Sequence, residues 1–122
     1  MVGPVERISA VTLVVRAMAT SVAFYDSLGF ERLYGGVDDA FTSYAVGTGY
    51  LNLQALEGPT RPGAGWGRVV FWVEDVDAQH RRAVAAGLRP STEPADAPWG
   101  ERYFHLEDPD GHELSFARPL DA

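Results

Sequence analysis

Three histidines are the side chains of this 122-residue sequence best suited to bind a metal ion or to transfer a proton near neutral pH. His80 falls in a segment with helical character, His105 in an alternating segment, and His112 directly after the turn sequence DPDG. No two of them stand at a spacing typical of a metal-binding motif. Cysteine is absent, which excludes thiolate ligands, thiol nucleophiles and disulfide bonds. We expect helix packing for His80 and turn chemistry for His112, whereas the role of His105 stays open.

Aromatic side chains form a second group, suited to noncovalent binding. Tyr50, Trp72 and Trp99 carry flat apolar faces on which a planar ligand could stack. Such contacts add on the order of 1 kcal/mol beyond the burial of area. Packing inside the protein is the alternative for Trp72 and, more strongly, for Trp66.

The composition is that of a globular domain with an acidic surface: 46% of residues are hydrophobic, 11% are aromatic, and the formal net charge is −7. We expect no nucleic-acid partner, because phosphate binding needs a basic surface. An acidic field favours cationic ligands, although it also simply maintains solubility. No apolar run reaches membrane-spanning length and the start, MVGPVERIS, lacks the features of a signal peptide, so a cytoplasmic location without membrane contact is expected.

The elements that position these side chains occur twice. Residues 11–15 (VTLVV) and 69–73 (VVFWV) are short β-branched runs, and each precedes a helical segment that ends at Gly29 or Gly87. The second unit follows the first at an offset of 58 residues, which indicates a duplicated strand and helix. Thr20 or Ser21 is the expected cap of the first helix, and Asp75 that of the second.

Short strands follow each glycine. They are predicted at residues 31–34, 41–46 and 50–56 in the first half and at residues 89–93, 101–107 and 113–118 in the second. Each half is therefore a βαβββ module. The chain is a single domain over residues 1–122, with modules at 8–56 and 68–118 and a Gly- and Pro-rich linker at 57–67. The predicted fold class is α+β: two tandem modules whose sheets are each covered by one helix, with the uncovered faces forming a shared curved cleft.

Three segments carry a family resemblance: SVAFYDSLGF, WVEDVDAQHRRAVAAGL and PWGERYFHLEDPDGHELSFARP. They resemble the vicinal oxygen chelate superfamily, which contains glyoxalase I, extradiol dioxygenases, fosfomycin-resistance enzymes and bleomycin-resistance proteins. The resemblance covers nearly the whole chain. Its motifs, FYxxLGF and DPDGxxL, belong to the scaffold and do not choose among the functions of the superfamily.

In metal-dependent members, the resemblance implies His or Glu ligands on the first and last strands of each module. The matching positions here hold Ala10, Asn52, Arg68 and Ser115. A divalent ion needs imidazole nitrogens or carboxylate oxygens at about 2 Å, whereas alanine offers no donor and a guanidinium repels the cation. A register shift of two residues would add a single carboxylate, Glu113. We therefore predict neither a metal nor another cofactor in this cleft.

Strand alternation predicts which side chains accompany those positions into the cleft. Trp99 is added because it lies in a loop that borders the ligand site in the resistance-type relatives. The predicted ligand-binding residues are Tyr50, Asn52, Arg68, Trp72, Trp99, Glu113 and Ser115. In such an apolar setting Arg68 needs an anionic partner, which could be Glu113, another acid or the ligand.

These features favour a metal-independent binding protein similar to the bleomycin-resistance group, with no catalytic residue. It would sequester an aromatic or cationic antibiotic or related natural product, and a homodimer would complete the cleft. The alternative is a lyase or dioxygenase of the same superfamily. Such an enzyme would be metal-dependent with ligands elsewhere, or cofactor-free with Glu113, His105 or Tyr50 as acid or base. A scaffold protein with a vestigial cleft is a third possibility, and the sequence does not decide whether one chain or two enclose each cleft.

Overall fold

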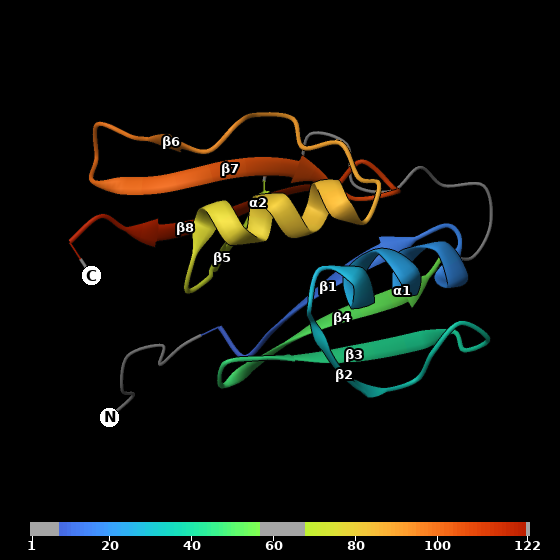
Figure 1. Cartoon of the computed structure of the whole chain (residues 1–122). Coiled ribbons are helices and arrows are strands. Elements are labelled where there is room, and N and C mark those ends of the chain that lie inside the picture. Colours follow the sequence, from blue (N-terminus) through green and yellow to red (C-terminus); the bar gives the residue numbers. More distant parts are fainter. Residues whose placement is uncertain (1–7, 57–67, 122) are drawn as a thin grey trace, which may run out of the picture.

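The two halves of the sequence fold as two βαβββ modules, as the sequence predicts (Figure 1). The computed structural model describes residues 8–56 and 68–121, so the predicted linker at 57–67 lies outside the described residues. The first module contains β1 (Ala10–Val15), α1 (Met18–Ser27), β2 (Glu31–Tyr34), β3 (Phe41–Val46) and β4 (Gly49–Ala55). The second contains β5 (Arg68–Trp72), α2 (Val76–Ala85), β6 (Ala95–Asp96), β7 (Glu101–Glu107) and β8 (Glu113–Pro119).

Each module forms its own four-stranded sheet, in the order β1-β4-β3-β2 or β5-β8-β7-β6. The first strand of each module pairs in parallel with the last strand, and the other pairs are antiparallel. The strands β1 and β5, which carry the duplicated β-branched runs, therefore both lie at the edge of a sheet.

The two helices begin differently. The side chain of Asp75 accepts a hydrogen bond from the amide of Ala78 and caps α2 as predicted. The prediction of Thr20 or Ser21 as the cap of α1 is wrong, because the helix already begins at Met18, with Ala17 at the cap position and no side-chain cap. Ser21 instead lies buried in the first turn, and its hydroxyl donates to Asp110 Oδ2 at 3.4 Å.

The predicted strand at 89–93 is also wrong. The edge strand of the second sheet is β6, and its two residues pair with β7 further along the chain. Pro90 and Pro94 lack the amide donors that a continuous ladder needs. The segment still follows β7 by isolated bonds: the amide of Ser91 donates to the carbonyl of His105 at 2.8 Å, and the amide of His105 donates to Thr92 Oγ1 at 3.0 Å.

One hydrophobic core connects the two modules. It contains inward-facing residues of both sheets and of both helices, among them Leu13, Leu53, Phe71 and Phe116. The ring of Phe30, which follows α1, lies 5.0 Å from that of Phe71 and 6.3 Å from that of Phe116 in the other module. Figure 1 shows α2 over the second sheet and α1 over the first, and the shared core places the helix-covered faces of the two sheets toward each other. The sheet faces without a helix, called the outer faces below, therefore point away from each other.

This arrangement bears on the expected shared cleft. Over most of their area, the described residues of one chain do not bring the two outer faces together, because the shared core joins the opposite, helix-covered faces. Near the starts of β1, β4 and β5, residues of both modules, among them Ala10, Tyr50, Arg68 and Val70, line one pocket of about 460 Å³. Beyond this pocket, a cleft formed by both outer faces needs more than the described part of one chain.

The DPDG turn fastens the modules to each other through Asp108. One carboxylate oxygen accepts the hydroxyl of Tyr25 on α1 at 2.8 Å, and the other accepts the amides of Asp110 and His112, both at 2.9 Å. Burial raises the pKa of Asp108, and burial together with Asp108 raises the pKa of Tyr25 well above its usual value. The turn is thus a buried polar link to the first module.

Two further contacts strengthen this link. Arg16 Nε donates to Asp110 Oδ1 at 2.9 Å. His112, which is 3% exposed, places Nε2 2.7 Å from the carbonyl oxygen of Val14. A carbonyl oxygen only accepts, so Nε2 of His112 carries a proton. The turn role expected for His112 is present, and the side chain also reaches β1 of the other module.

Candidate ligand-binding site

The outer face of the second sheet is a grid of three rows that cross β5, β8 and β7. Along each of these strands, residues that point into the core alternate with residues of the outer face. The strand register therefore determines which outer-face residues are neighbours. In order, the rows are Arg68, Glu113 and Glu107; Val70, Ser115 and His105; and Trp72, Ala117 and Tyr103. Four of the seven predicted site residues, Arg68, Trp72, Glu113 and Ser115, thus lie on one surface.

The first row holds an ion pair. Arg68 Nε and Nη2 both lie 3.1 Å from Glu113 Oε2, so the anionic partner that the sequence required for Arg68 is Glu113. The side chains are 47% and 35% exposed, and a pair this open to water contributes about 1 kcal/mol or less to stability. Its main effect is to neutralise the guanidinium, while the neighbouring Glu107 leaves this end of the face negative.

The middle row contains a contact that the sequence left undecided. His105 Nδ1 lies 2.6 Å from Ser115 Oγ, and Ser115 is only 3% exposed. Burial, followed by the nearby Arg68, lowers the pKa of His105, although Glu113 opposes the shift. The imidazole is therefore neutral near pH 7. Alternation along β7 hinted at this position, but its partner on β8 follows only from the pairing of the strands.

The third row opens onto exposed aromatic rings. Trp99, just before β7, stacks on Tyr103 with ring centres 5.8 Å apart, and Tyr103 lies 5.0 Å from the ring of His105. Trp99 and Trp72 are 68% and 66% exposed, so neither is a core residue. We call Trp99, Tyr103 and His105, which follow one another along the chain and not across the strands, the aromatic row. Tyr103 was not among the predicted site residues, although its alternation with His105 was a usable signal.

The outer face of the first sheet is polar. Asn52, the remaining position on a last strand, accepts the hydroxyl of Ser43 at 2.7 Å and donates its amide to Thr12 Oγ1 at 3.3 Å. Tyr50 lies two residues before it and is 49% exposed. These residues form a hydrogen-bonding surface that belongs to a different module from the aromatic row.

His80 has the structural role predicted for it. It lies half-buried on α2, edge-on to Phe104 at 5.1 Å between ring centres. Its Nε2 lies 3.6 Å from Glu93 Oε2. It is therefore remote from the outer faces, because Phe104 belongs to the core.

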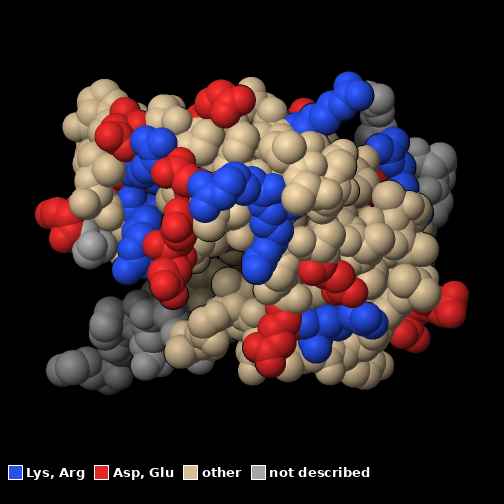
Figure 2. All heavy atoms as spheres, viewed as in Figure 1, with Lys and Arg blue, Asp and Glu red and all other residues tan. Residues whose placement is uncertain are grey.

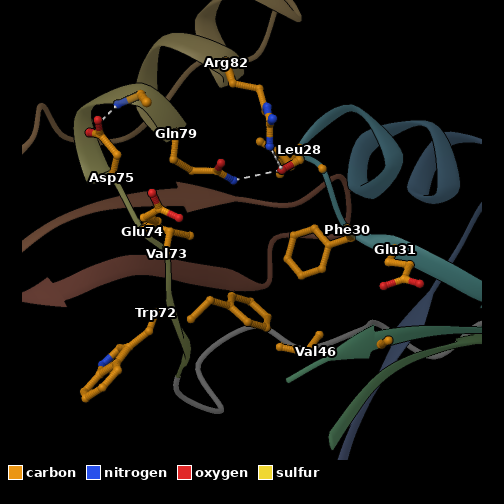
Figure 3. Close-up of a pocket in the computed structure, with 14 residues that line it drawn as sticks. Leu28, Phe30, Glu31, Val46, Trp72, Val73, Glu74, Asp75, Gln79 and Arg82 are labelled. Carbon is orange, nitrogen blue, oxygen red and sulfur yellow. Dashed lines mark hydrogen bonds between the residues drawn. The ribbon is translucent and has the colours of Figure 1, made fainter. Parts of the chain in front are cut away.

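A separate pocket of about 490 Å³ lies between the modules (Figure 3). Its walls include Phe30 and Phe71, and Figure 3 shows Gln79 and Arg82 on α2 both reaching the carbonyl oxygen of Leu28, at 3.0 and 3.1 Å. Those donors are thus already used to join α2 to the first module. Trp72 is one of the side chains that line this pocket, but the other six predicted ligand-binding residues are not among them. The pocket therefore does not coincide with the predicted site.

Charges of both signs are interspersed around the hollow on the face shown in Figure 2. Ion pairs of the described residues also alternate the two signs: Arg102 pairs with Asp77 and with Asp96, both at 2.9 Å. This face therefore carries no continuous basic surface of the kind that binds nucleic acid.

A model of the Glyoxalase/Bleomycin resistance protein/Dioxygenase superfamily matches residues 7–116. The chain belongs to this superfamily. Among curated proteins, "Putative glyoxylase CFP32" of Mycobacterium bovis is 33% identical over an alignment of 102 residues, and the match covers 76% of this chain and 39% of that protein. The chain spans 28–39% of the length of the curated relatives it matches.

Solved structures share the fold of this superfamily member. TioX from Micromonospora sp. ML1 is 25% identical with a TM-score of 0.73, over 94% of this chain and all (100%) of that one. A bleomycin-binding protein complexed with bleomycin is 22% identical with a TM-score of 0.71, over 93% of this chain and 98% of that one. At this identity the second likeness shows the fold alone.

The donor chemistry of this chain does not fit the divalent ion that many members of the superfamily hold. Ala10 offers no donor, Arg68 is a cation, and the oxygens of Asn52 and Ser115 are neutral and engaged by neighbouring side chains. Within residues 8–56 and 68–121, no three His, Asp or Glu side chains gather where they could hold an ion. In the same residues no helix is long and apolar enough to cross a membrane.

Proposed function

We propose that this superfamily member is a metal-independent binding protein that sequesters a planar aromatic small molecule, of the antibiotic or natural-product class. The observation that carries the proposal is the exposure of Trp72 and Trp99 on an outer face whose ligand positions lack metal-binding donors. Large aromatic side chains that gather at the surface of a globular domain are typical of a binding surface.

Stacking supplies the binding energy in this proposal. The aromatic row and Trp72 offer ring faces from two sides of the grid, and stacked pairs are worth about 1 kcal/mol beyond burial. Charge sets a second preference. Glu107 and the acidic net charge of −7 favour a ligand with a cationic substituent, because Glu113 is already neutralised by Arg68.

A second copy of the chain would complete the site. The two outer faces point away from each other in one chain, and Leu33, Tyr34 and Val70 are exposed by 54%, 66% and 51%. A homodimer that sets the polar outer face of one chain against the aromatic outer face of its partner would cover these residues and the edge strands β1 and β5. Light scattering tests this: a mass of one chain at micromolar concentration would refute it.

The test of binding is a native mass-spectrometry screen of metal-analysed protein against bleomycin and other aromatic natural products. We expect one ligand per outer-face site in protein without bound metal. Trp72→Ala should weaken binding roughly 5- to 30-fold, as for a stacking residue worth 1–2 kcal/mol. Val84→Ala, which truncates an exposed apolar side chain on α2, is the matched control and should bind like the parent. Stoichiometric metal together with no bound compound would overturn the proposal.

A further inference from the structure

The hydroxyl proton of Ser115 has a single destination among the described residues. Ser115 is 3% exposed, and its Oγ makes one hydrogen bond there, to His105 Nδ1 at 2.6 Å. If Nδ1 carried the proton and donated to Oγ, the serine hydroxyl would have no acceptor, which costs roughly 1–3 kcal/mol for a buried group. Ser115 therefore donates, and Nδ1 accepts.

That direction fixes the tautomer of the imidazole. A neutral ring carries one proton, so when Nδ1 accepts, the proton is on Nε2. Among residues 8–56 and 68–121, Nε2 of His105 has no hydrogen-bond partner, and no fully buried side-chain nitrogen there is unpaired, so Nε2 is not fully buried. The outer face thus presents one oriented, unused N–H donor at the end of the aromatic row.

The surroundings select what this donor would bind. Tyr103 supplies a ring face 5.0 Å from His105, and Val70, 51% exposed, lies beyond Ser115 in the same row. An anionic acceptor is disfavoured, because Glu113 and Glu107 lie in the adjacent row and the nearby cation Arg68 is paired. A neutral carbonyl oxygen attached to an aromatic ring meets these conditions.

We propose that His105, oriented by Ser115, donates its Nε2–H to a carbonyl oxygen of the aromatic ligand and so selects aryl carbonyl compounds over aromatic hydrocarbons. The proposal deepens the proposed function and rests on it. Ser115 is a positioning residue in this scheme, because it acts only through His105.

A pair of probes of equal shape isolates the donor: methyl naphthyl ketone, and isopropenylnaphthalene, in which a CH₂ group replaces the carbonyl oxygen. Their affinities are measured by NMR titration of the full chain. We expect the ketone to bind about fivefold more tightly, the effect of one net hydrogen bond. His105→Phe keeps a ring but no donor and should reduce this ratio to about 1, whereas His105→Gln keeps an N–H donor and should retain part of it.

A second measurement does not depend on any variant folding. Nitrogen NMR distinguishes protonated from unprotonated ring nitrogens, and we expect the Nε2–H tautomer of His105 at neutral pH in the parent chain. Ser115→Ala should produce a mixture of tautomers.

The outcomes separate the two proposals. Equal affinity for both probes, or an Nδ1–H tautomer in the parent, refutes the role of His105 and leaves aromatic binding intact. If neither probe binds while the screen described above also finds no ligand, the proposed function fails and this inference fails with it.

Discussion

His105 shows most clearly how the meaning of one residue depends on its neighbours. The sequence placed it on a strand face but could not say which one, because a strand register error of one residue moves every side chain to the opposite face. The pairing of β7 with β8 sets it opposite Ser115, and Trp99 and Tyr103 extend the surface beside it. A histidine without a motif thereby becomes part of the proposed binding surface.

The lowered pKa of His105 predicts a pH dependence of stability. Because the folded-state pKa lies below that of the unfolded chain, the unfolded state binds the proton more tightly, and stability is lost as the pH falls through both values. The charged groups that face the ring are Arg68, which disfavours its protonation, and Glu113, which favours it.

The measurement is urea denaturation at pH 7.5 and at pH 5 for the parent and for His105→Gln. We expect the parent to lose more stability between the two conditions than the variant, which cannot titrate. An identical loss in both proteins would show that His105 has an ordinary pKa.

At the scale of elements, the helices of the two modules differ in how their N-termini are capped. Asp75 caps α2 through the amide of Ala78, whereas the equivalent position of α1 holds Ala17 in the same extended conformation, with φ of −134° beside −138° for Asp75. The start of α2 therefore has a side-chain acceptor that the start of α1 lacks, although the backbone at Ala17 has the conformation that a capping residue needs.

A pair of substitutions tests this asymmetry. Asp75→Ala should destabilise the protein by about 1 kcal/mol, and Ala17→Ser should stabilise it by about 0.5–1 kcal/mol, because a serine hydroxyl can accept an amide in the first turn. Thermal and urea denaturation measure both changes. Destabilisation by Ala17→Ser would mean that the helix start is constrained by its contacts with the second module.

At the scale of the molecule, the contact between modules is carried by the core and by the buried turn around Asp108. Asp108→Ala would leave the hydroxyl of Tyr25 and two backbone amides without their acceptor, so we expect a loss of about 3 kcal/mol or more. Asp108→Asn retains an oxygen for the amides and an N–H₂ group for the tyrosine oxygen. It should therefore remain within about 1 kcal/mol of the parent.

Urea denaturation of the two variants decides between a structural and a purely electrostatic role for this carboxyl. A loss of stability in Asp108→Asn equal to that in Asp108→Ala would show that the negative charge, and not hydrogen-bond geometry, holds the modules together.

The sequence by itself determined the module, its duplication and most strand positions. These rest on local signals: glycines that adopt positive φ after each helix, at Gly29 and Gly87, and β-branched runs 58 residues apart. From the family resemblance it also predicted that four positions lack metal-binding side chains: Ala10, Asn52, Arg68 and Ser115. Local signals failed at residues 89–93, where two prolines interrupt the predicted strand and the edge strand forms further along the chain. They also failed at the start of α1, where Ser21 bonds to Asp110 and does not cap the helix.

Only the tertiary structure decided how the surfaces face. Which side of each sheet the helices cover, and that both outer faces of one chain point outward, follows from a core shared by residues from both modules. The contacts of Ser115 with His105 and of Arg68 with Glu113 depend on strand pairing between distant segments. Periodicity reports the alternation of one strand, whereas a binding surface is made by the register among several strands, which is set by the packing of the whole chain.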